Sequence, residues 1–236
     1  MKICILENDH LDPAVAGRYV GYGAMFERLL RDAGASATFD IFNTVDGQYP
    51  DSFDAYDAVL LTGGRADAFS TDPWVVTLRE KVNGLLNAAG KTKLIGVCLG
   101  HQLIALCMGA KVGRSPYGWG AGRMTYQWLV PNFAGEHDLH EIALLASHQD
   151  QVFELPTGAT LLAASDFCPV AAFAVADQVL CIQPHPEFVE DYSAYLLEKR
   201  RLRLGEDVYQ AGIENLSKGH EGGKFARMTL AFIAGT

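Results

Sequence analysis

The sequence lacks any uninterrupted apolar run of the roughly 18 residues that a membrane-spanning helix requires. Its opening residues, MKICILENDH, become charged and polar from Glu7 onward. They therefore lack the longer apolar region and the small-residue cleavage site of a secretory signal peptide. From these absences we predict a cytoplasmic location and no membrane partner.

Basic residues are scarce. The 236 residues include 19 Lys and Arg against 28 Asp and Glu, which gives a formal net charge of -9. A protein that binds the phosphate backbone needs a basic face. We therefore predict no nucleic-acid partner.

Paired cysteines are also missing. The five cysteines are widely spaced, and no two of them form a Cys-x-x-Cys pair, so we predict neither a structural zinc site nor any other metal site. An odd count without an export signal favours free thiols in a reducing compartment. The five are Cys4, Cys98, Cys107, Cys168 and Cys181.

No complete nucleotide-binding motif is present. The stretch GLLNAAGKT from Gly84 to Thr92 has five residues between its glycines where a phosphate-binding loop has four, and it follows a predicted helix rather than a strand. Gly21-Tyr-Gly23 and Gly118-Trp-Gly120 lack the third glycine of a dinucleotide fingerprint. We therefore predict no cofactor.

What the chain does contain is an alternation of short apolar runs with longer helical patterns. This alternation predicts an α/β fold with a mostly parallel central sheet flanked by helices. No linker or repeat interrupts it, so we predict one domain over residues 1–236. The predicted strands cover residues 2–6, 38–42, 58–62, 93–97, 123–130, 141–146, 159–164, 170–175 and 179–183, the later ones partly antiparallel. The predicted helices cover residues 22–33, 72–89 (ending at Gly90), 99–108 and much of the chain after 190, with breaks at Gly205 and Gly219.

One strand-to-helix junction has the form Gly-x-Cys-x-Gly, with Cys98 at its centre. Glycines two residues to either side are typical of a sharp turn in which a side chain would clash. Such a turn exposes the thiol at a helix N-terminus, where the helix dipole favours the thiolate, and its backbone N–H groups can stabilise an oxyanion. Cys98 is therefore the candidate nucleophile.

A base for this nucleophile follows another predicted strand, in the segment Gln183-Pro-His185-Pro-Glu187. The two prolines favour extended backbone. In an extended segment, side chains two residues apart project to the same side, so Glu187 can orient the imidazole of His185.

Together these segments resemble the class I glutamine amidotransferase family, especially its free-standing members that are similar to GMP synthase. The resemblance rests on several anchors that occur in the family's order. They are the first strand, Thr62-Gly63-Gly64, the Cys98 turn with Gln102, Ser147-His148-Gln149-Asp150, and the His185-Pro-Glu187 segment. The resemblance implies a flavodoxin-like fold and a Cys98–His185–Glu187 triad.

It also implies roles for further residues. Cys98 attacks the side-chain amide of glutamine or a γ-glutamyl amide, and the resulting γ-glutamyl thioester is hydrolysed. The backbone N–H groups of Gly64 and Leu99 form the oxyanion hole. The expected substrate-binding residues are Gly63, Gln102, Ser147, His148 and Gln149.

Several alternatives remain open from the sequence. A full GMP synthase carries an ATP-dependent synthetase half that is missing here, so an ammonia-delivering glutaminase would need a separate synthetase subunit. A γ-glutamyl peptidase would act alone. A non-catalytic module on the same scaffold would have little reason to keep all three triad residues. In a related class of cysteine hydrolases a histidine follows the nucleophile directly, whereas here Leu99 does.

Two loops and one basic run complete the predictions. The aromatic and glycine-rich segments 12–22 and 117–122 are candidates for the wall of the pocket on the acceptor side. The basic run Lys199-Arg200-Arg201-Leu202-Arg203 is predicted to be helical, and its charges favour a solvated face or a subunit contact.

Overall fold

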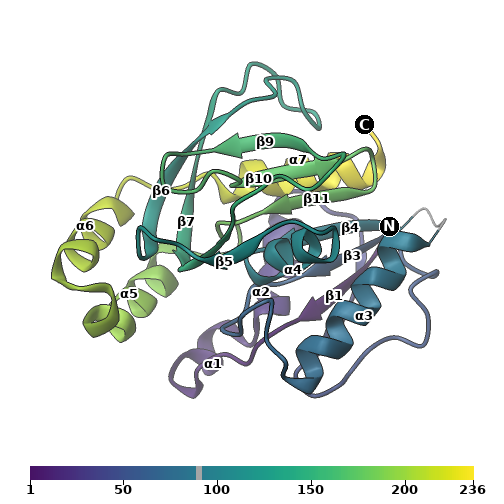
Figure 1. Cartoon of the computed structure of the whole chain (residues 1–236), viewed down its shortest axis with the longest axis horizontal. Helices are drawn as coiled ribbons and strands as arrows, with labels where there is room; N and C mark the ends of the chain where they lie inside the picture. The colour runs from purple at the N-terminus through teal and green to yellow at the C-terminus, as the bar shows by residue number, and fades with distance from the viewer. Residues whose placement is uncertain (89–91) are drawn as a thin grey trace.

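The computed structural model of the protein describes residues 1–88 and 92–236. At its centre is a nine-stranded sheet with the strand order β2-β1-β3-β4-β11-β10-β9-β6-β7 (Figure 1). Its strands are β1 (Lys2–Glu7), β2 (Thr38–Asn43), β3 (Ala58–Leu61), β4 (Lys93–Val97), β6 (Gly120–Trp128), β7 (Glu141–His148), β9 (Thr160–Ala164), β10 (Ala172–Val175) and β11 (Val179–Ile182). A separate ladder pairs β5 (Val112–Arg114) with β8 (Asp150–Val152).

The sheet has a parallel half and an antiparallel half. β2, β1, β3, β4 and β11 pair in parallel, while β10, β9, β6 and β7 continue the sheet with antiparallel pairing. The carboxyl ends of parallel strands meet at one edge of a sheet, where open α/β folds place their ligands. Cys98 follows β4 at this edge, and Gln183 follows the neighbouring β11. The predicted fold class, α/β with a mostly parallel sheet, is confirmed.

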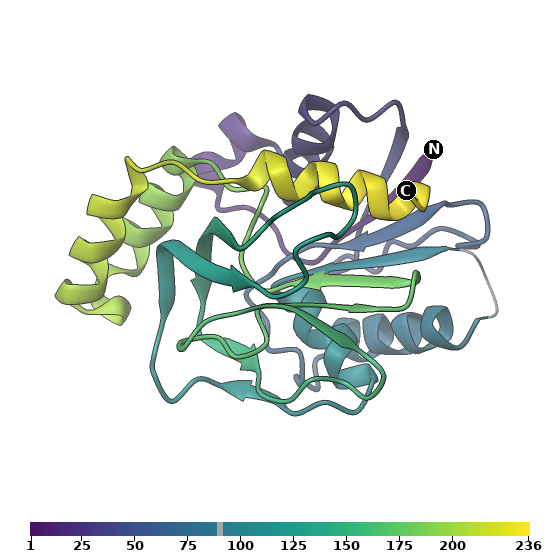
Figure 2. The same cartoon turned by 90° about the horizontal axis from the view of Figure 1, so that it is seen from above.

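Helices cover both faces of the parallel half (Figure 2). α2 (Tyr22–Asp32) and α7 (Gly222–Ala234) pack on one face, and α3 (Pro73–Asn87) and α4 (Leu99–Cys107) pack on the other. Side chains alternate along β1 accordingly, because successive residues of a strand point to opposite faces. Ile3 and Ile5 contribute to the apolar cluster under α2 and α7, whereas Cys4 and Leu6 contribute to the cluster under α3 and α4.

The remaining helices lie at the side of the sheet rather than over it. They are α1 (Pro13–Tyr19), α5 (Glu190–Leu204) and α6 (Glu206–Leu216), and Figure 1 shows α5 and α6 beside β6 and β7. A third apolar cluster joins them to the body of the protein and includes Phe188, Tyr192 and Leu197. Gly205, with a φ of 79°, lies between α5 and α6.

The predicted strands and the long helices are present, with ends that shift by a few residues. The predicted helix over residues 72–89 ends at Asn87, and its expected stop at Gly90 lies outside the described residues. The prediction of a plain loop from Asp12 to Tyr22 is wrong, because this segment contains α1. Asp12 caps α1 by accepting a hydrogen bond from the Ala14 N–H at 2.9 Å, with Pro13 in the first turn.

Candidate active site

Cys98 lies in the turn between β4 and α4, with φ at 51° and ψ at −103°. Few side chains adopt this backbone conformation, so the surrounding structure must hold it in place. The flanking glycines leave no room for a side chain. A Cβ on Gly96 would lie 2.8 Å from the carbonyl oxygen of Gly100, and a Cβ on Gly100 would lie 2.5 Å from that of Leu61. The turn therefore requires glycine at both positions.

Hydrogen bonds anchor the turn to the neighbouring strand β11 and to the helix that follows it. The Cys98 N–H donates to the Ile182 carbonyl in β11 at 3.0 Å, and the Gln102 N–H donates to the Cys98 carbonyl at the same distance. The thiol lies at the N-terminal end of α4, where the helix dipole stabilises negative charge. Cys98 is only 5% exposed.

His185 and Glu187 lie together beside this turn. Their side chains meet at 2.7 Å between Nδ1 of the imidazole and Oε1 of the carboxylate. The His185 N–H donates to the Leu145 carbonyl of β7 at 2.7 Å, and the imidazole stacks on Phe188 with ring centroids 3.9 Å apart. The histidine is therefore held by backbone, carboxylate and aromatic contacts at once.

The environment of His185 favours its protonated form. Burial by itself lowers the pKa of this imidazole, but the Glu187 carboxylate, and after it Cys98, raise the pKa further than burial lowers it, to about 10. Cys98 is also a hydrogen-bond partner of the imidazole. A proton that leaves the sulfur therefore has a strongly basic acceptor beside it.

The loop after β3 brings Gly63 and Gly64 against this pair. A Cβ on Gly63 would lie 2.5 Å from Cε1 of His185 and 3.3 Å from Cβ of Cys98. A Cβ on Gly64 would lie 2.9 Å from Cδ2 of Leu99, so the loop touches the first residue of α4. Neither the Gly64 nor the Leu99 N–H donates a hydrogen bond to another described residue. Both donors are free for a ligand.

Residues at the end of β1 hold this loop in position. The side-chain amide of Asn8 donates to the Thr62 carbonyl at 2.8 Å, and the Asn8 N–H donates to the Thr62 hydroxyl at 2.9 Å. The next residue, Asp9, accepts from the Arg65 N–H at 3.0 Å and from two nitrogens of the Arg65 guanidinium at 2.7 Å each.

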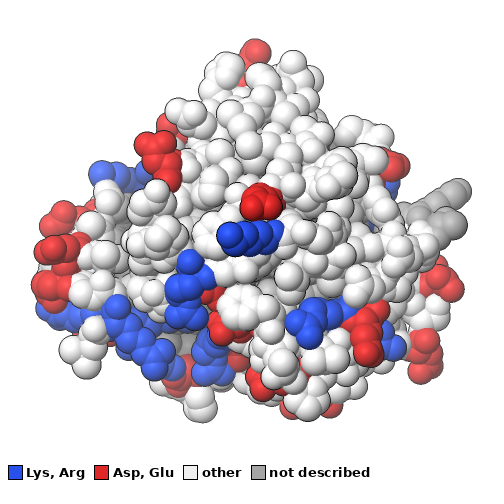
Figure 3. Space-filling model, in the orientation of Figure 1, with Lys and Arg blue, Asp and Glu red and all other residues white. Residues whose placement is uncertain are grey.

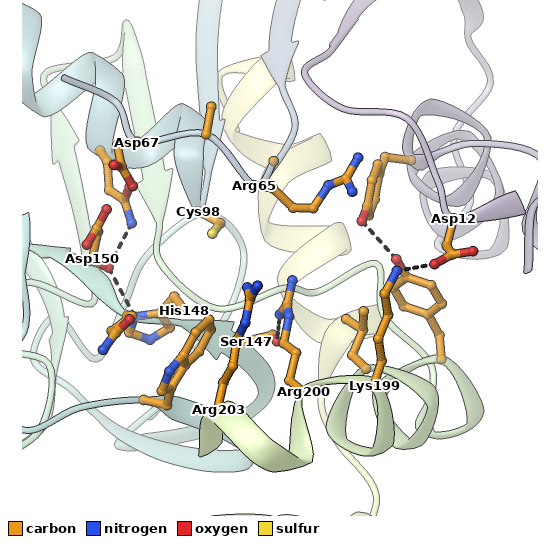
Figure 4. Close-up of a pocket in the computed structure, with 18 of the residues that line it drawn as sticks. Asp12, Arg65, Asp67, Cys98, Ser147, His148, Asp150, Lys199, Arg200 and Arg203 are labelled. Carbon is orange, nitrogen blue, oxygen red and sulfur yellow. Dashed lines mark hydrogen bonds and ion pairs between the residues drawn. The ribbon is translucent and has the colours of Figure 1, made fainter. Parts of the chain in front are cut away.

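A cavity of about 770 Å³ opens above Cys98. Volumes of ~300–1,000 Å³ are typical of pockets that hold ligands of drug size. Figure 4 shows the sulfur of Cys98 facing this space, with His148 and Asp150 on one side and α5 on the other. The cavity is lined by residues 10, 12, 22, 64–67, 98, 102, 114, 119, 147–150, 192, 195, 196, 199, 200 and 203.

Of the predicted substrate-binding residues, all but Gly63 line this cavity, and some of their polar groups are already bonded. Gln102 donates from Nε2 to the Asp150 carbonyl at 2.8 Å and to Oε1 of Gln183 at 3.1 Å. Gln149 accepts from Arg114 at 2.8 Å through Oε1.

His148 is neutral in this setting. Burial lowers the pKa of this imidazole, a backbone contact with Asp150 raises it, and the nearby His185 lowers it, which together bring the pKa to about 4. Its Nδ1 lies 3.2 Å from the Asp150 carbonyl. Its Nε2 is buried without a polar partner among the described residues, at a point where a Cβ on Gly120 would lie 2.8 Å away. His148 therefore offers the cavity a neutral, largely covered ring.

The helix α5 forms one wall of the cavity, which the sequence analysis did not predict. Lys199, Arg200 and Arg203 of α5 line the cavity, whereas the basic run that contains them was predicted to form a solvated face or a subunit contact. Successive helical residues are rotated by about 100°, which places these three within one arc and Arg201 and Leu202 outside it. That periodicity was the available signal.

Segments 12–22 and 117–122 were predicted to form part of the pocket wall, but only three of their residues line the cavity. Asp12 and Tyr22, at the two ends of segment 12–22, line the cavity, while α1 between them does not. From segment 117–122 only Trp119 lines it. Tyr22 is joined to Tyr192 of α5 by a hydrogen bond between their hydroxyl groups at 2.8 Å.

Two further features are absent from residues 1–88 and 92–236. No three His, Cys, Asp or Glu side chains of these residues converge in a way that would hold a metal ion. None of their helices combines the length and the apolar character needed to cross a bilayer.

Comparison with known proteins identifies similar sequences. A family model described as glutamine amidotransferase class-I matches residues 18–200. Gamma-glutamyl peptidase 3 of Arabidopsis thaliana is 36% identical over 178 residues, which make up 72% of this chain and 70% of that protein. Gamma-glutamyl peptidase 5 of the same plant is 32% identical over 209 residues, covering 84% of this chain and 82% of that protein.

Similar folds occur among solved structures. A glutamine amidotransferase from Thermotoga maritima matches with a TM-score of 0.75 and 19% identity, covering 99% of this chain and 96% of that one. A glutamine amidotransferase from Methylobacillus flagellatus matches with a TM-score of 0.70 and 19% identity, covering 100% of this chain and 94% of that one. At such identities the likeness concerns the fold.

Proposed function

Because the chain belongs to the glutamine amidotransferase class-I family, we propose that it hydrolyses γ-glutamyl amide bonds with Cys98 as the nucleophile. The observation that carries this proposal is the arrangement of Cys98 at the floor of an open cavity beside the buried His185–Glu187 pair. A nucleophile, a base and a group that orients the base are the parts that such hydrolysis requires.

In the first half of the reaction, His185 holds the proton that the thiol has given up, and the sulfur of Cys98 attacks the γ-carbonyl carbon. Glu187 stabilises the imidazolium that forms, which is consistent with its raising of the His185 pKa. The free N–H groups of Gly64 and Leu99 bind the oxyanion of the tetrahedral intermediate. His185 then returns the proton to the departing amine, which leaves a γ-glutamyl thioester on Cys98.

In the second half, His185 removes a proton from water, and the resulting hydroxide attacks the thioester carbonyl. The carbon–sulfur bond breaks, His185 returns the proton to the departing sulfur, and glutamate leaves with Cys98 regenerated. We assign Gly63, Gln102, Ser147, His148 and Gln149 to the binding of the substrate. Their lining of the cavity, or for Gly63 its contact with His185, supports this assignment.

We propose further that the leaving amine is an amino acid or a short peptide. The cavity extends well beyond Cys98 along α5, which gives a leaving group larger than ammonia a place to bind. The similarity to proteins named gamma-glutamyl peptidases supports the same choice. The alternative within the family is a glutaminase that passes ammonia to a separate synthetase subunit.

Glutamate release by the purified protein tests this function. The substrates are γ-glutamylglycine, glutathione and glutamine. We expect release from the two peptides to exceed release from glutamine, and Cys98→Ala to lower it by about a thousandfold or more. Cys107→Ala, which alters a half-buried thiol at the far end of α4, is the matched control. Turnover by Cys98→Ala near the level of the intact protein would refute the nucleophile, and release from glutamine alone would favour the glutaminase.

A further inference from the structure

The cavity is positively charged although the protein is acidic. Five Lys or Arg side chains line it against three Asp side chains, in a chain with a formal net charge of -9. Figure 3 shows Lys and Arg gathered on this face of the molecule, near α5. Such a local excess of charge attracts anionic ligands.

Three of the five cations are neutralised by nearby carboxylates. Arg65 pairs with Asp9 at 2.7 Å, and Lys199 pairs with Asp12. Arg114 pairs with Asp150 at 2.7 Å and with Asp67 at 3.4 Å. These ion pairs account for every acidic residue that lines the cavity.

The other two cations, Arg200 and Arg203, form no ion pair with a carboxylate of the described residues. Arg200 is nevertheless oriented, since its Nη1 donates to the Ser147 hydroxyl and its guanidinium lies 5.4 Å from the centre of the Trp119 ring. Figure 4 shows both arginine side chains extending from α5 into the cavity. Two guanidinium groups one helical turn apart thus face the cavity without a countercharge.

The two arginines line the part of the cavity that lies away from the triad. α5 begins just after Glu187, and its residues Tyr192, Leu196, Arg200 and Arg203 follow one another along the cavity. Tyr192 packs on Phe188, which stacks on His185, so the start of α5 is at the triad and the arginines lie farther out. The outer part of the cavity is where a leaving group would extend.

The distances suit a short peptide. Ser147, the partner of Arg200, lies two residues beyond Leu145, which is about 7 Å along a strand. Leu145 in turn receives the hydrogen bond from the His185 N–H. A leaving group of one or two residues spans about 3.5–7 Å from the scissile nitrogen to its terminal carboxylate.

We propose that Arg200 and Arg203 bind the free carboxylate of the leaving group, so that the enzyme prefers γ-glutamyl amino acids and short γ-glutamyl peptides with an unblocked C-terminus. This inference rests on the proposed function. Guanidinium groups form paired, charge-assisted hydrogen bonds with carboxylates, which a neutral amide does not match. The arginines therefore act in substrate selection and not in the chemical steps.

The test compares two substrates that differ only in this carboxylate, γ-glutamylglycine and γ-glutamylglycinamide. Hydrogen bonds to charged groups contribute about 1.5–3 kcal/mol, so we expect the intact protein to prefer the acid by about ten- to a hundredfold in kcat/KM. In Arg203→Met, and in the double variant with Arg200→Met, this ratio should fall toward one. Arg201→Met is the matched control, because Arg201 pairs with Glu206 and does not line the cavity.

Equal loss on both substrates would overturn the inference, since it would mean that the arginines bind the glutamyl end or only support the fold. A ratio near one in the intact protein would overturn it as well. Calorimetric titration of Cys98→Ala with both compounds separates this inference from the proposed function. Suppose that Cys98→Ala binds the acid more tightly than the amide, that Cys98→Ala/Arg203→Met loses this preference, and that the intact protein turns over neither compound. This result would refute the hydrolysis but support the carboxylate site. Binding without preference would refute the site.

Discussion

The two sides of the cavity are built on different principles. Around Cys98 the backbone is packed so closely that Gly63, Gly64, Gly96 and Gly100 have no room for a Cβ. Across the cavity, α5 presents long charged side chains, of which Arg203 is exposed and Arg200 half-buried. The first side therefore depends on the fold, and nearly any change there disturbs the proposed chemistry. The second depends on individual side chains, which can alter substrate preference while the fold stays intact.

The largest effect is expected from a change on the tightly packed side that preserves its shape. Glu187→Gln keeps the size of the side chain and one acceptor oxygen, but it removes the charge that faces His185 at 2.7 Å. We expect kcat for a γ-glutamyl substrate to fall by about 10²- to 10⁴-fold, in line with losses at the third member of other triads. Glu198→Gln, on the exposed side of α5, is the control. An activity within about twofold of the intact protein would contradict a role for Glu187 in orienting the base.

We expect Glu187→Gln also to change how the unfolding free energy depends on pH. His185 has a pKa raised from 6.5 to about 10, because Glu187 and Cys98 outweigh the opposing effect of burial. A raised folded-state pKa stabilises the protein fully below pH 6.5, and this stabilisation is lost as the pH rises through about 10. Urea denaturation between pH 6 and pH 10 should therefore show a steeper loss of unfolding free energy in the intact protein than in Glu187→Gln. Parallel curves would contradict the ion pair.

A third prediction concerns the backbone around Cys98. In Gly100→Ala the new Cβ would lie 2.5 Å from the Leu61 carbonyl oxygen and 2.7 Å from the Leu61 Cβ. Since both atoms belong to a buried strand, α4 must shift, and we expect a loss of about 1–3 kcal/mol in unfolding free energy. The shift also moves the Leu99 N–H, so turnover should fall as well.

The control for this variant is a glycine with free space around it. Gly84 lies inside α3, and nothing lies within 4 Å of a Cβ placed there. Gly84→Ala should raise the unfolding free energy by about 0.5–1 kcal/mol, because alanine favours the helix. Urea denaturation of the two variants should thus give opposite signs. A Gly100→Ala protein as stable as the intact one would contradict the steric account of the turn.

The tightly packed side could be predicted from the sequence because its determinants are local. Gly96, Cys98 and Gly100 lie within five residues, and His185 and Glu187 are two residues apart, so each motif contains its own geometric requirement. The strands before both motifs were apolar enough to recognise. The two motifs meet because β4 pairs in parallel with β11, a pairing that the sequence analysis did not predict.

The α5 side could not be predicted in the same way. Arg200 meets Ser147 across 53 positions of sequence, and Lys199 meets Asp12 across 187. Neither contact leaves a local pattern. The basic run was predicted to be helical. Which of its side chains line the cavity depends on how α5 packs against the rest of the protein, and the sequence of the run does not contain that information. The helix α1, in contrast, has a local signal that was overlooked. It begins at Asp12-Pro13, the same pattern that predicted the helix beginning at Asp72-Pro73.

The smallest effect is expected on the outer face of α5. Leu202 is fully exposed, next to Arg203 in sequence but on the side of the helix that faces away from the cavity. Leu202→Ser removes no contact, so it should change the unfolding free energy by no more than about 0.5 kcal/mol and should leave kcat/KM within about twofold. The acid-to-amide preference should stay as in the intact protein, in contrast to Arg203→Met.

This comparison of neighbouring residues sharpens the assignment of the two faces of α5. Light scattering on Leu202→Ser and the intact protein adds the oligomeric state to the kinetic readout. An assembly that dissociates in the variant would show that the outer face is covered by a second chain, as one sequence-based prediction allowed. A changed substrate preference would instead show that the charged side of the cavity depends on the docking of the whole helix. If Leu202→Ser leaves the oligomeric state and the substrate preference unchanged while Arg203→Met alters the preference, the preference depends on the guanidinium group, since only Arg203→Met removes one.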